Sequence, residues 1–154
     1  MSRSESILVA TDFSECSEQA VQYAFDLAAG LGATVHLVHV YSLQGMLEAA
    51  WPTHEAIEDA EAFAERKLGE LAKRHQSSGS VGQVRAYLGD PAESILRAAV
   101  DLDADMIVVG THGRRGLKRL VLGSVAETVV RLAACPVVVI RQPAVRAKER
   151  SSAA

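Results

Sequence analysis

The hydrophobic positions of this chain gather into five short runs that are rich in β-branched residues. These runs are Ile7–Thr11, Thr34–Val40, Val84–Leu88, Met106–Gly110 and Pro136–Ile140. Runs of this length and composition predict β-strands. Three of them are nearly continuous in apolar residues instead of alternating, which is typical of strands covered on both faces in a parallel sheet. The pattern therefore predicts a parallel sheet buried between helices.

Helical spacing of apolar residues fills the segments between these runs, and several helix ends can be recognised. The motif Asp12-x-x-Glu15 resembles a capping box, and Gly32 stands where a C-terminal glycine belongs. A second, strongly charged helix is expected from about Glu55 to His75. The third helix opens with the cap and proline Asp90-Pro91, and the fourth opens with Ser124-Val-Ala-Glu127, another capping box.

Strands and helices therefore alternate in the order βαβαβαβαβ, which predicts a single α/β domain with right-handed crossovers. The domain is expected to span residues 1–142, and residues 143–154 to form a disordered tail. Gln76–Gly82, rich in serine and glycine, is expected to be a surface loop. Tyr41–Thr53 is a longer connection, for which a lid, a dimer contact and a plain loop all remain open.

Length and charge narrow the class of protein. At 154 residues the chain can bury one core without disulfides or a structural metal, and Cys16 and Cys135 are too far apart in sequence to form a disulfide framework. No apolar run approaches the roughly 18 residues that span a bilayer, and the polar N-terminus has no signal-peptide pattern. We therefore expect a cytoplasmic protein without a membrane partner. The net charge of -3 argues against general nucleic-acid binding.

One stretch of the chain is locally basic and rich in glycine. After the fourth expected strand come Gly110, Gly113 and, nine residues later, Gly123-Ser124. Glycines let backbone N–H groups approach an anion closely, and a helix N-terminus adds unpaired donors and a partial positive charge. The cations Arg114, Arg115, Lys118 and Arg119 reinforce the positive field. The stretch predicts a phosphate-binding loop, although Ser124 alone is equally explained as a helix cap.

These residues carry a family resemblance. The spacing G-x2-G-x9-G-[ST] resembles the ATP-binding signature of the universal stress protein family, and the segments ILVATDFS, GDPAESI, DMIVVGTHGRRG and LGSVAETVVRLAACPVVVI extend the likeness over almost the whole chain. The resemblance implies a Rossmann-like, open, parallel five-stranded sheet in the order 3-2-1-4-5 with helices on both faces. It also implies a homodimer joined through the last strand, Pro136–Ile140.

The same resemblance implies a nucleotide site at the point where strands one and four become neighbours and their outgoing loops diverge. Asp12 and Val40 would hold the adenosine part, although without the resemblance helix capping explains Asp12 and core packing explains Val40. The ribose and phosphates would be lined by Gly110, Gly113, Arg114, Gly123, Ser124 and Val125. The implied cofactor is ATP, with or without Mg²⁺.

The sequence offers no reaction to match this site. Ser14, His39 and Asp12 could be imagined as a triad, but there is no nucleophile elbow, and His36 and His39 lie on opposite faces of one strand, where they cannot easily share a metal. We therefore assign no catalytic and no metal-binding residues. The leading hypothesis is an ATP-binding, homodimeric stress-response protein that acts through nucleotide-dependent partner contacts. A nucleotide-independent dimeric interaction module and a slow ATPase are the alternatives; the roles of His112 and Cys16 stay open.

Overall fold

A computed structural model describes residues 5–44, 52–111 and 122–141 of the chain. Its elements follow in the order β1 (Ser6–Ala10), α1 (Glu15–Leu31), β2 (Thr34–Tyr41), α3 (His54–His75), β3 (Ser80–Leu88), α4 (Pro91–Asp101), β4 (Met106–Gly110), α5 (Ser124–Leu132) and β5 (Val137–Ile140). The expectations for His112, Gly113, Arg114, the tail and much of the connection after Tyr41 lie outside these residues.

The five strands form one parallel sheet in the order β3-β2-β1-β4-β5. This confirms the order implied by the family resemblance. β1 pairs with β2 from Ser6–Thr34 to Ala10–Val38, and with β4 from Ile7–Met106 to Val9–Val108. The chain therefore leaves β1 toward one edge of the sheet and leaves β4 toward the other, so the loops that follow these two strands diverge at the carboxyl end of the sheet.

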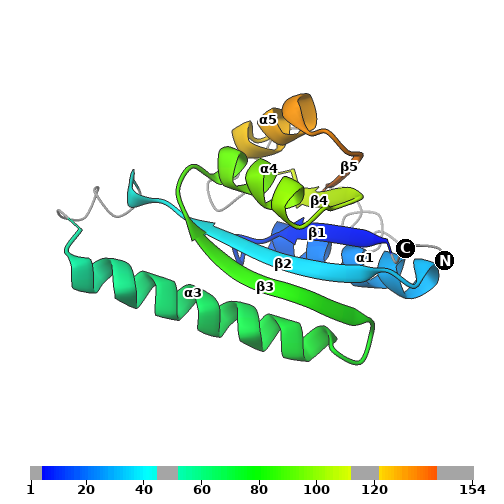
Figure 1. Ribbon diagram of the computed structural model, residues 1–154, viewed down its shortest axis with the longest axis horizontal. Helices are drawn as coiled ribbons and strands as arrows, with labels where there is room; N and C mark the ends of the chain where they lie inside the picture. The colour runs from blue at the N-terminus through cyan, green and yellow to red at the C-terminus, as the bar shows by residue number, and fades with distance from the viewer. Residues whose placement is uncertain (1–4, 45–51, 112–121, 142–154) are drawn as a thin grey trace, which may run out of the picture.

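Helices cover both faces of the sheet, as Figure 1 shows, with α4 and α5 on one side and α3 on the other. The core under α1 and α3 includes Val9, Leu37 and Phe25, and the core under α4 and α5 includes Leu8, Val38 and Ile107. Neighbours such as Leu8 and Val9 enter opposite cores because successive strand side chains point to opposite faces. The central residues of β1, Ile7 to Val9, are buried on both faces of the sheet, which explains the apolar run there.

Two of the helix ends that the sequence indicated are confirmed. The Asp90 side chain accepts a hydrogen bond from the N–H of Glu93 at 2.9 Å, and Pro91 follows it as the first residue of α4. Gly32 ends α1 in the left-handed conformation with φ of 66°, where a side chain would be strained. These caps fix where the polypeptide enters and leaves the helices.

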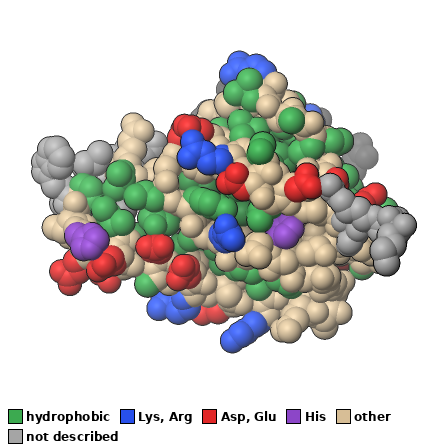
Figure 2. All heavy atoms as spheres, viewed as in Figure 1, with side chains coloured by type: hydrophobic (Ala, Val, Ile, Leu, Met, Phe, Trp, Pro, Cys, Tyr) green, Lys and Arg blue, Asp and Glu red, His purple; other side chains and the backbone are tan. Residues whose placement is uncertain are grey.

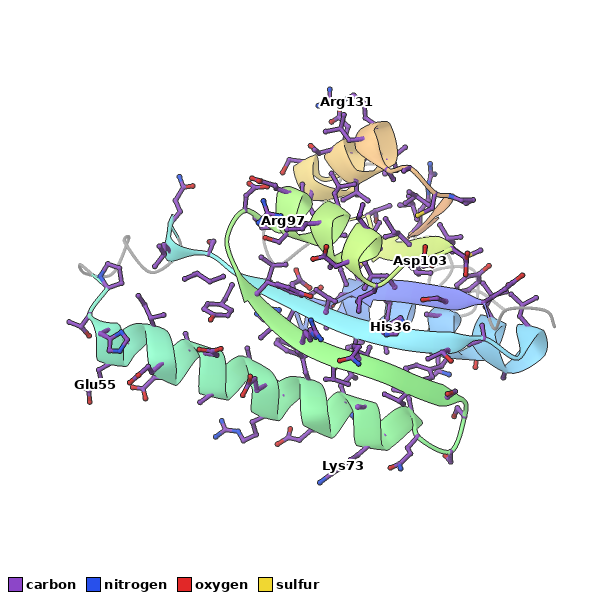
Figure 3. All side chains as sticks on the ribbon, viewed as in Figure 1. His36, Glu55, Lys73, Arg97, Asp103 and Arg131 are labelled. Carbon is purple, nitrogen blue, oxygen red and sulfur yellow. The ribbon has the colours of Figure 1, made fainter. Side chains whose placement is uncertain are left out.

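The helix α3 is the longest element and the most polar. Figure 3 shows Glu55 near its start and Lys73 near its end, so that acidic and basic side chains match the two ends of the helix dipole. Charged side chains of both signs spread over the described residues in Figure 2, without a broad basic area on the face in view. Among the described residues no helix is long and apolar enough to cross a membrane.

The surface loop expected over Gln76–Gly82 is shorter than the sequence suggested, because β3 already begins at Ser80. The register between β2 and β3 shifts between Val35 and Leu37, which marks a bulge opposite His36. There the Nδ1 atom of His36 accepts the backbone N–H of Gln83 at 2.8 Å. A Cβ on Gly82 would lie 2.6 Å from the His36 ring, so glycine here permits close strand packing and does not signal a loop.

We expect the free energy of unfolding to decrease as the pH falls below about 6.5. Burial, and then the charge of Arg85, lowers the pKa of His36, and burial with the charge of Arg74 lowers the pKa of His75. A histidine whose folded pKa is depressed stabilises the fold above its unfolded pKa and loses that contribution as the pH falls through its folded pKa. Urea unfolding measured between pH 7.5 and 5.5 checks this expectation.

The variant His36→Asn is the matched control, because an amide oxygen can still accept the Gln83 N–H but does not titrate. Its unfolding free energy should decrease less steeply over the same pH range. An identical pH dependence in the variant and the original protein would contradict the role given to His36.

Candidate functional site

The turn after β1 places Asp12 at the carboxyl end of the sheet, but not as the helix cap that its spacing to Glu15 suggested. The N-cap of α1 is Ser14, whose side chain accepts a hydrogen bond from the N–H of Ser17. Asp12 instead accepts hydrogen bonds from the backbone N–H and the hydroxyl of Ser14 through its Oδ1 atom. The capping explanation for Asp12 is therefore wrong: Asp12 lies two residues before the cap, and its carboxylate holds the cap in place.

The buried hydroxyl groups of Thr11 and Ser17 stabilise this turn through hydrogen bonds. Thr11 and Ser17 are 4% and 5% exposed, and their side-chain oxygens lie 3.0 Å apart. The Ser17 hydroxyl also bonds the Ser14 carbonyl at 3.0 Å, and Thr11 Oγ1 accepts the N–H of Phe13 at 3.0 Å. Because buried polar groups are costly unless paired, this network favours one conformation of the turn. Phe13 adopts a φ of 64° within it, which is rare for a bulky residue.

The imagined triad of Ser14, His39 and Asp12 does not form. The Ser14 hydroxyl donates a hydrogen bond to Asp12, and the Nδ1 atom of His39 lies 2.7 Å from the carbonyl oxygen of Thr11. A carbonyl oxygen can only accept, so this imidazole nitrogen carries a proton and cannot take one from Ser14 through Nδ1. The described contacts therefore do not provide an activated serine nucleophile.

The end of β4 lies tightly against the start of α1. A Cβ on Gly110 would come within 2.9 Å of the Cys16 sulfur and 3.4 Å of the Cys16 backbone. The same sulfur lies 3.8 Å from Thr111 Oγ1 and 3.6 Å from the Ile140 carbonyl. Close helix-to-strand packing thus explains Gly110, and this contact brings the start of α1 close to the strand that precedes the glycine loop.

The N-terminus of α5 is organised differently from the capping box that the sequence suggested. Its N-cap is Gly123, and Ser124 is the first helical residue, so Ser124 is not the cap. The N–H of Gly123 donates to the Thr111 carbonyl at 2.6 Å, so the residue after β4 and the N-cap of α5 lie side by side. The first bond within the helix runs from Glu127 N–H to the Gly123 carbonyl. The helix itself therefore offers no acceptor for the N–H groups of Ser124 and Val125.

The topology brings most of the predicted site residues to one edge of the sheet. Asp12 follows β1, Gly110 ends β4, Val40 stands near the end of β2, and Gly123 to Val125 begin α5. Carboxyl ends of parallel strands meet at the same edge, and β1 and β4 are neighbours there. Val40 and Val125 also pack against the core under α4 and α5, so their side chains contribute to folding as well.

The described residues contain no cluster of three or more histidine, cysteine or acidic side chains that could hold a metal ion. A separate pocket of about 240 Å³ lies between α1 and α3, lined by Glu15, Glu18, Gln19, Gln22, Leu71, Arg74 and His75. Arg74 and Glu18 form a 3.6 Å ion pair across it, with both side chains half exposed. None of the predicted site residues lines this pocket, and such a solvated ion pair contributes little stability.

Sequence reasoning missed the supporting residues Thr11 and Ser17, and it considered His39 only as a member of a triad or as a metal ligand. Their roles depend on contacts across the turn and between strands, which no spacing rule reveals. The signal that was available is the concentration of short hydroxyl side chains in Thr11–Ser17, directly after an apolar strand. Such residues favour turns and caps because their side chains bond nearby backbone groups.

Comparison with known proteins gives consistent results. Residues 4–141 match the model of the universal stress protein family. The chain is 32% identical to the universal stress protein MJ0531 of Methanocaldococcus jannaschii over 89% of this chain and 82% of that protein. The solved structure of MJ0577 from the same organism is 29% identical and aligns with a TM-score of 0.81 over 90% of this chain and 96% of that chain. A universal stress protein in complex with cAMP is 25% identical, with a TM-score of 0.64 over 91% and 98% of the two chains.

We predict that Gly110→Ala destabilises the protein by about 1–3 kcal/mol, the usual cost of an extra methyl group in a packed site. The added Cβ would press on the Cys16 sulfur, so Cys16→Ala should relieve part of that cost. A double-mutant cycle measured by urea unfolding checks this. The double variant should lose less unfolding free energy than the sum of the losses in the two single variants. Strict additivity would contradict the assigned contact.

Proposed function

The chain belongs to the universal stress protein family, and we propose that it binds ATP at the carboxyl edge of the sheet, between the turn after β1 and the N-terminus of α5. Nucleotide occupancy then alters its contacts with partner proteins in a stress response. The observation that carries this proposal is the convergence of Asp12, Val40 and the first residues of α5 where two neighbouring strands send their loops in opposite directions.

The phosphate groups are assigned to the N-terminus of α5. The N–H groups of Ser124 and Val125 stand in the first turn of this helix, and the helix dipole favours an anion there. Because Gly123 already donates its N–H to Thr111, we assign it the shaping of the chain and not a hydrogen bond to phosphate. Gly110, Gly113 and Arg114 complete the proposed lining, with the last two outside the described residues.

The adenosine part is assigned to Asp12 and Val40. Asp12 already holds Ser14 through one oxygen, but a carboxylate offers about four acceptor positions and can also receive a ribose hydroxyl. The relative of known structure in complex with cAMP supports an adenine nucleotide as the ligand class. Mg²⁺ is compatible with this set, because that ion is commonly held by one carboxylate together with nucleotide phosphates.

The proposed activity is binding, with ATP hydrolysis at most slow and incidental. Phosphoryl transfer requires a positioned base or water in addition to the phosphate-binding groups. The hydroxyl of Ser14 and the Nδ1 proton of His39 are both engaged in hydrogen bonds within the turn. We therefore propose that ATP serves as an effector and not as a substrate.

Ser124→Pro tests the phosphate assignment. Proline removes both the N–H and the hydroxyl, yet it is tolerated as the first residue of a helix, and Gly123 already has the extended conformation with ψ of 156° that a following proline requires. Loss of a hydrogen bond to a charged group costs about 1.5–3 kcal/mol, so the Kd for ATP should rise about tenfold or more. Isothermal titration calorimetry measures the change.

His54→Pro is the matched control, because it places proline at the first position of α3 after an N-cap of similar conformation. This variant should bind ATP like the original protein. Negligible binding of ATP, ADP and AMP by the unaltered protein would refute the proposed function and favour a nucleotide-independent interaction module.

We further propose that the protein is a homodimer joined through β5. This strand, Val137–Ile140, stands at the end of the described sheet, and all four of its side chains are only partly buried. Uncovered edge strands promote aggregation unless another strand or an edge device covers them. A second copy of β5 is the simplest partner that would cover this edge.

Val139→Pro should convert the dimer to a monomer. The carbonyls of Pro136 and Ile140 face β4, where they accept hydrogen bonds from Ile107 and Thr111, so the alternating backbone groups of Val137 and Val139 face outward. Proline at this outward position removes a donor from the free edge without breaking the β4 ladder. Sedimentation at micromolar concentration should report a dimer for the original protein and for the control Val139→Thr. A monomeric original protein would contradict the proposal.

A further inference from the structure

The ladder between β1 and β2 ends in an unusual way. Thr11 donates its N–H to the Val38 carbonyl at 2.9 Å, just as the next residue of a continuing strand would. In a regular parallel ladder the Thr11 carbonyl would then accept the N–H of Val40. The pairing instead ends at Ala10 and Val38, and the carbonyl of Thr11 receives the Nδ1–H group of His39 at 2.7 Å. A side-chain hydrogen bond from His39 thus takes the place of the next backbone hydrogen bond of the ladder.

Because the His39 side chain takes the place of this backbone hydrogen bond, the direction of the Val40 backbone groups matters. The carbonyl of Val38 faces β1, whereas the carbonyl of Tyr41 faces β3 and accepts the N–H of Gly89 at 3.1 Å. Backbone groups alternate along a strand, so the N–H and carbonyl of Val40 face the β1 side. There β1 has ended and the chain turns away through Asp12. The backbone of Val40 therefore faces the edge to which the adenosine was assigned.

His39 also anchors the turn itself. Its ring packs against that of Phe13, with 4.5 Å between the ring centroids, and Phe13 holds the left-handed conformation in the middle of the turn. Asp12 lies between Thr11, whose carbonyl is hydrogen-bonded to His39, and Phe13, whose ring packs against the imidazole at a tilt of 34°. The imidazole thus fixes the backbone on both sides of the carboxylate.

We propose that His39 is the positioning residue of the adenosine site. By holding the Thr11 carbonyl, His39 ends the β1–β2 ladder before Val40 pairs, which leaves the Val40 N–H directed at the ligand. By packing against the Phe13 ring, it fixes Asp12. This inference rests on the proposed function for its ligand, an adenine nucleotide. The arrangement of Val40 and the turn is a property of the free protein and can be tested without nucleotide.

The first experiment compares His39→Leu with His39→Asn. Leucine and asparagine have nearly the same shape, but only asparagine can present an N–H close to the position of Nδ1. In His39→Leu the Thr11 carbonyl can instead accept the Val40 N–H, and the ATP Kd should rise about tenfold, as for the loss of one ligand hydrogen bond. His39→Asn should keep most of the affinity. Equal affinity in the two variants and the original protein overturns the proposal.

The second experiment uses NMR on the protein without nucleotide. The ¹⁵N shifts of His39 should identify the tautomer protonated at Nδ1, and the Val40 amide should exchange with solvent faster than the amide of Val38, which lies deeper in the sheet. In His39→Leu the exchange of Val40 should become slower. A protected Val40 amide in the unaltered protein overturns the proposal even if the variants do not fold. Failure of the unaltered protein to bind ATP refutes the proposed function, whereas the exchange data still decide whether His39 ends the ladder.

Discussion

The pairing of β1 with β4 is the constraint on which the rest of the molecule depends. Leu8, Val9, Ile107 and Val108 are all inaccessible to solvent at this pairing, with their side chains divided between the two cores. Fixing these strands side by side forces their outgoing loops to separate, because β1 continues toward β2 and β4 toward β5. The divergence of the two loops at the carboxyl edge is thus a consequence of strand order.

Backbone groups provide much of the chemistry at this edge. The N–H groups of Ser124 and Val125 are directed by the geometry of α5, and the Val40 backbone is directed by its place in the β2 strand. Side chains such as Ser14, Ser17 and His39 mainly hold the turn that carries Asp12. The proposed site suits a phosphate chain and a sugar, and its described residues offer few groups that could move protons during a reaction.

The strands and their order could be predicted because burial on both faces leaves long apolar runs, and because the family resemblance supplied the connectivity. The cap of α4 could be predicted since Asp90-Pro91 acts only on its neighbours. The caps predicted at Asp12 and Ser124 were wrong because the sequence motif does not fix which of several nearby residues is the cap. Ser14 is held as the cap by Asp12, and Gly123 by its hydrogen bond to the Thr111 carbonyl. The early start of β3 was missed because Gly82 was interpreted as a loop residue. Glycine is needed there because a side chain would collide with the ring of His36 on the neighbouring strand.

The most direct test of the central claim is an NMR titration of the protein with ATP, followed through its backbone amides. The account predicts saturable shift changes that are largest at Asp12, Val40, Ser124 and Val125, around the divergence of the loops after β1 and β4. No saturable change, or changes confined to the pocket between α1 and α3, would contradict it.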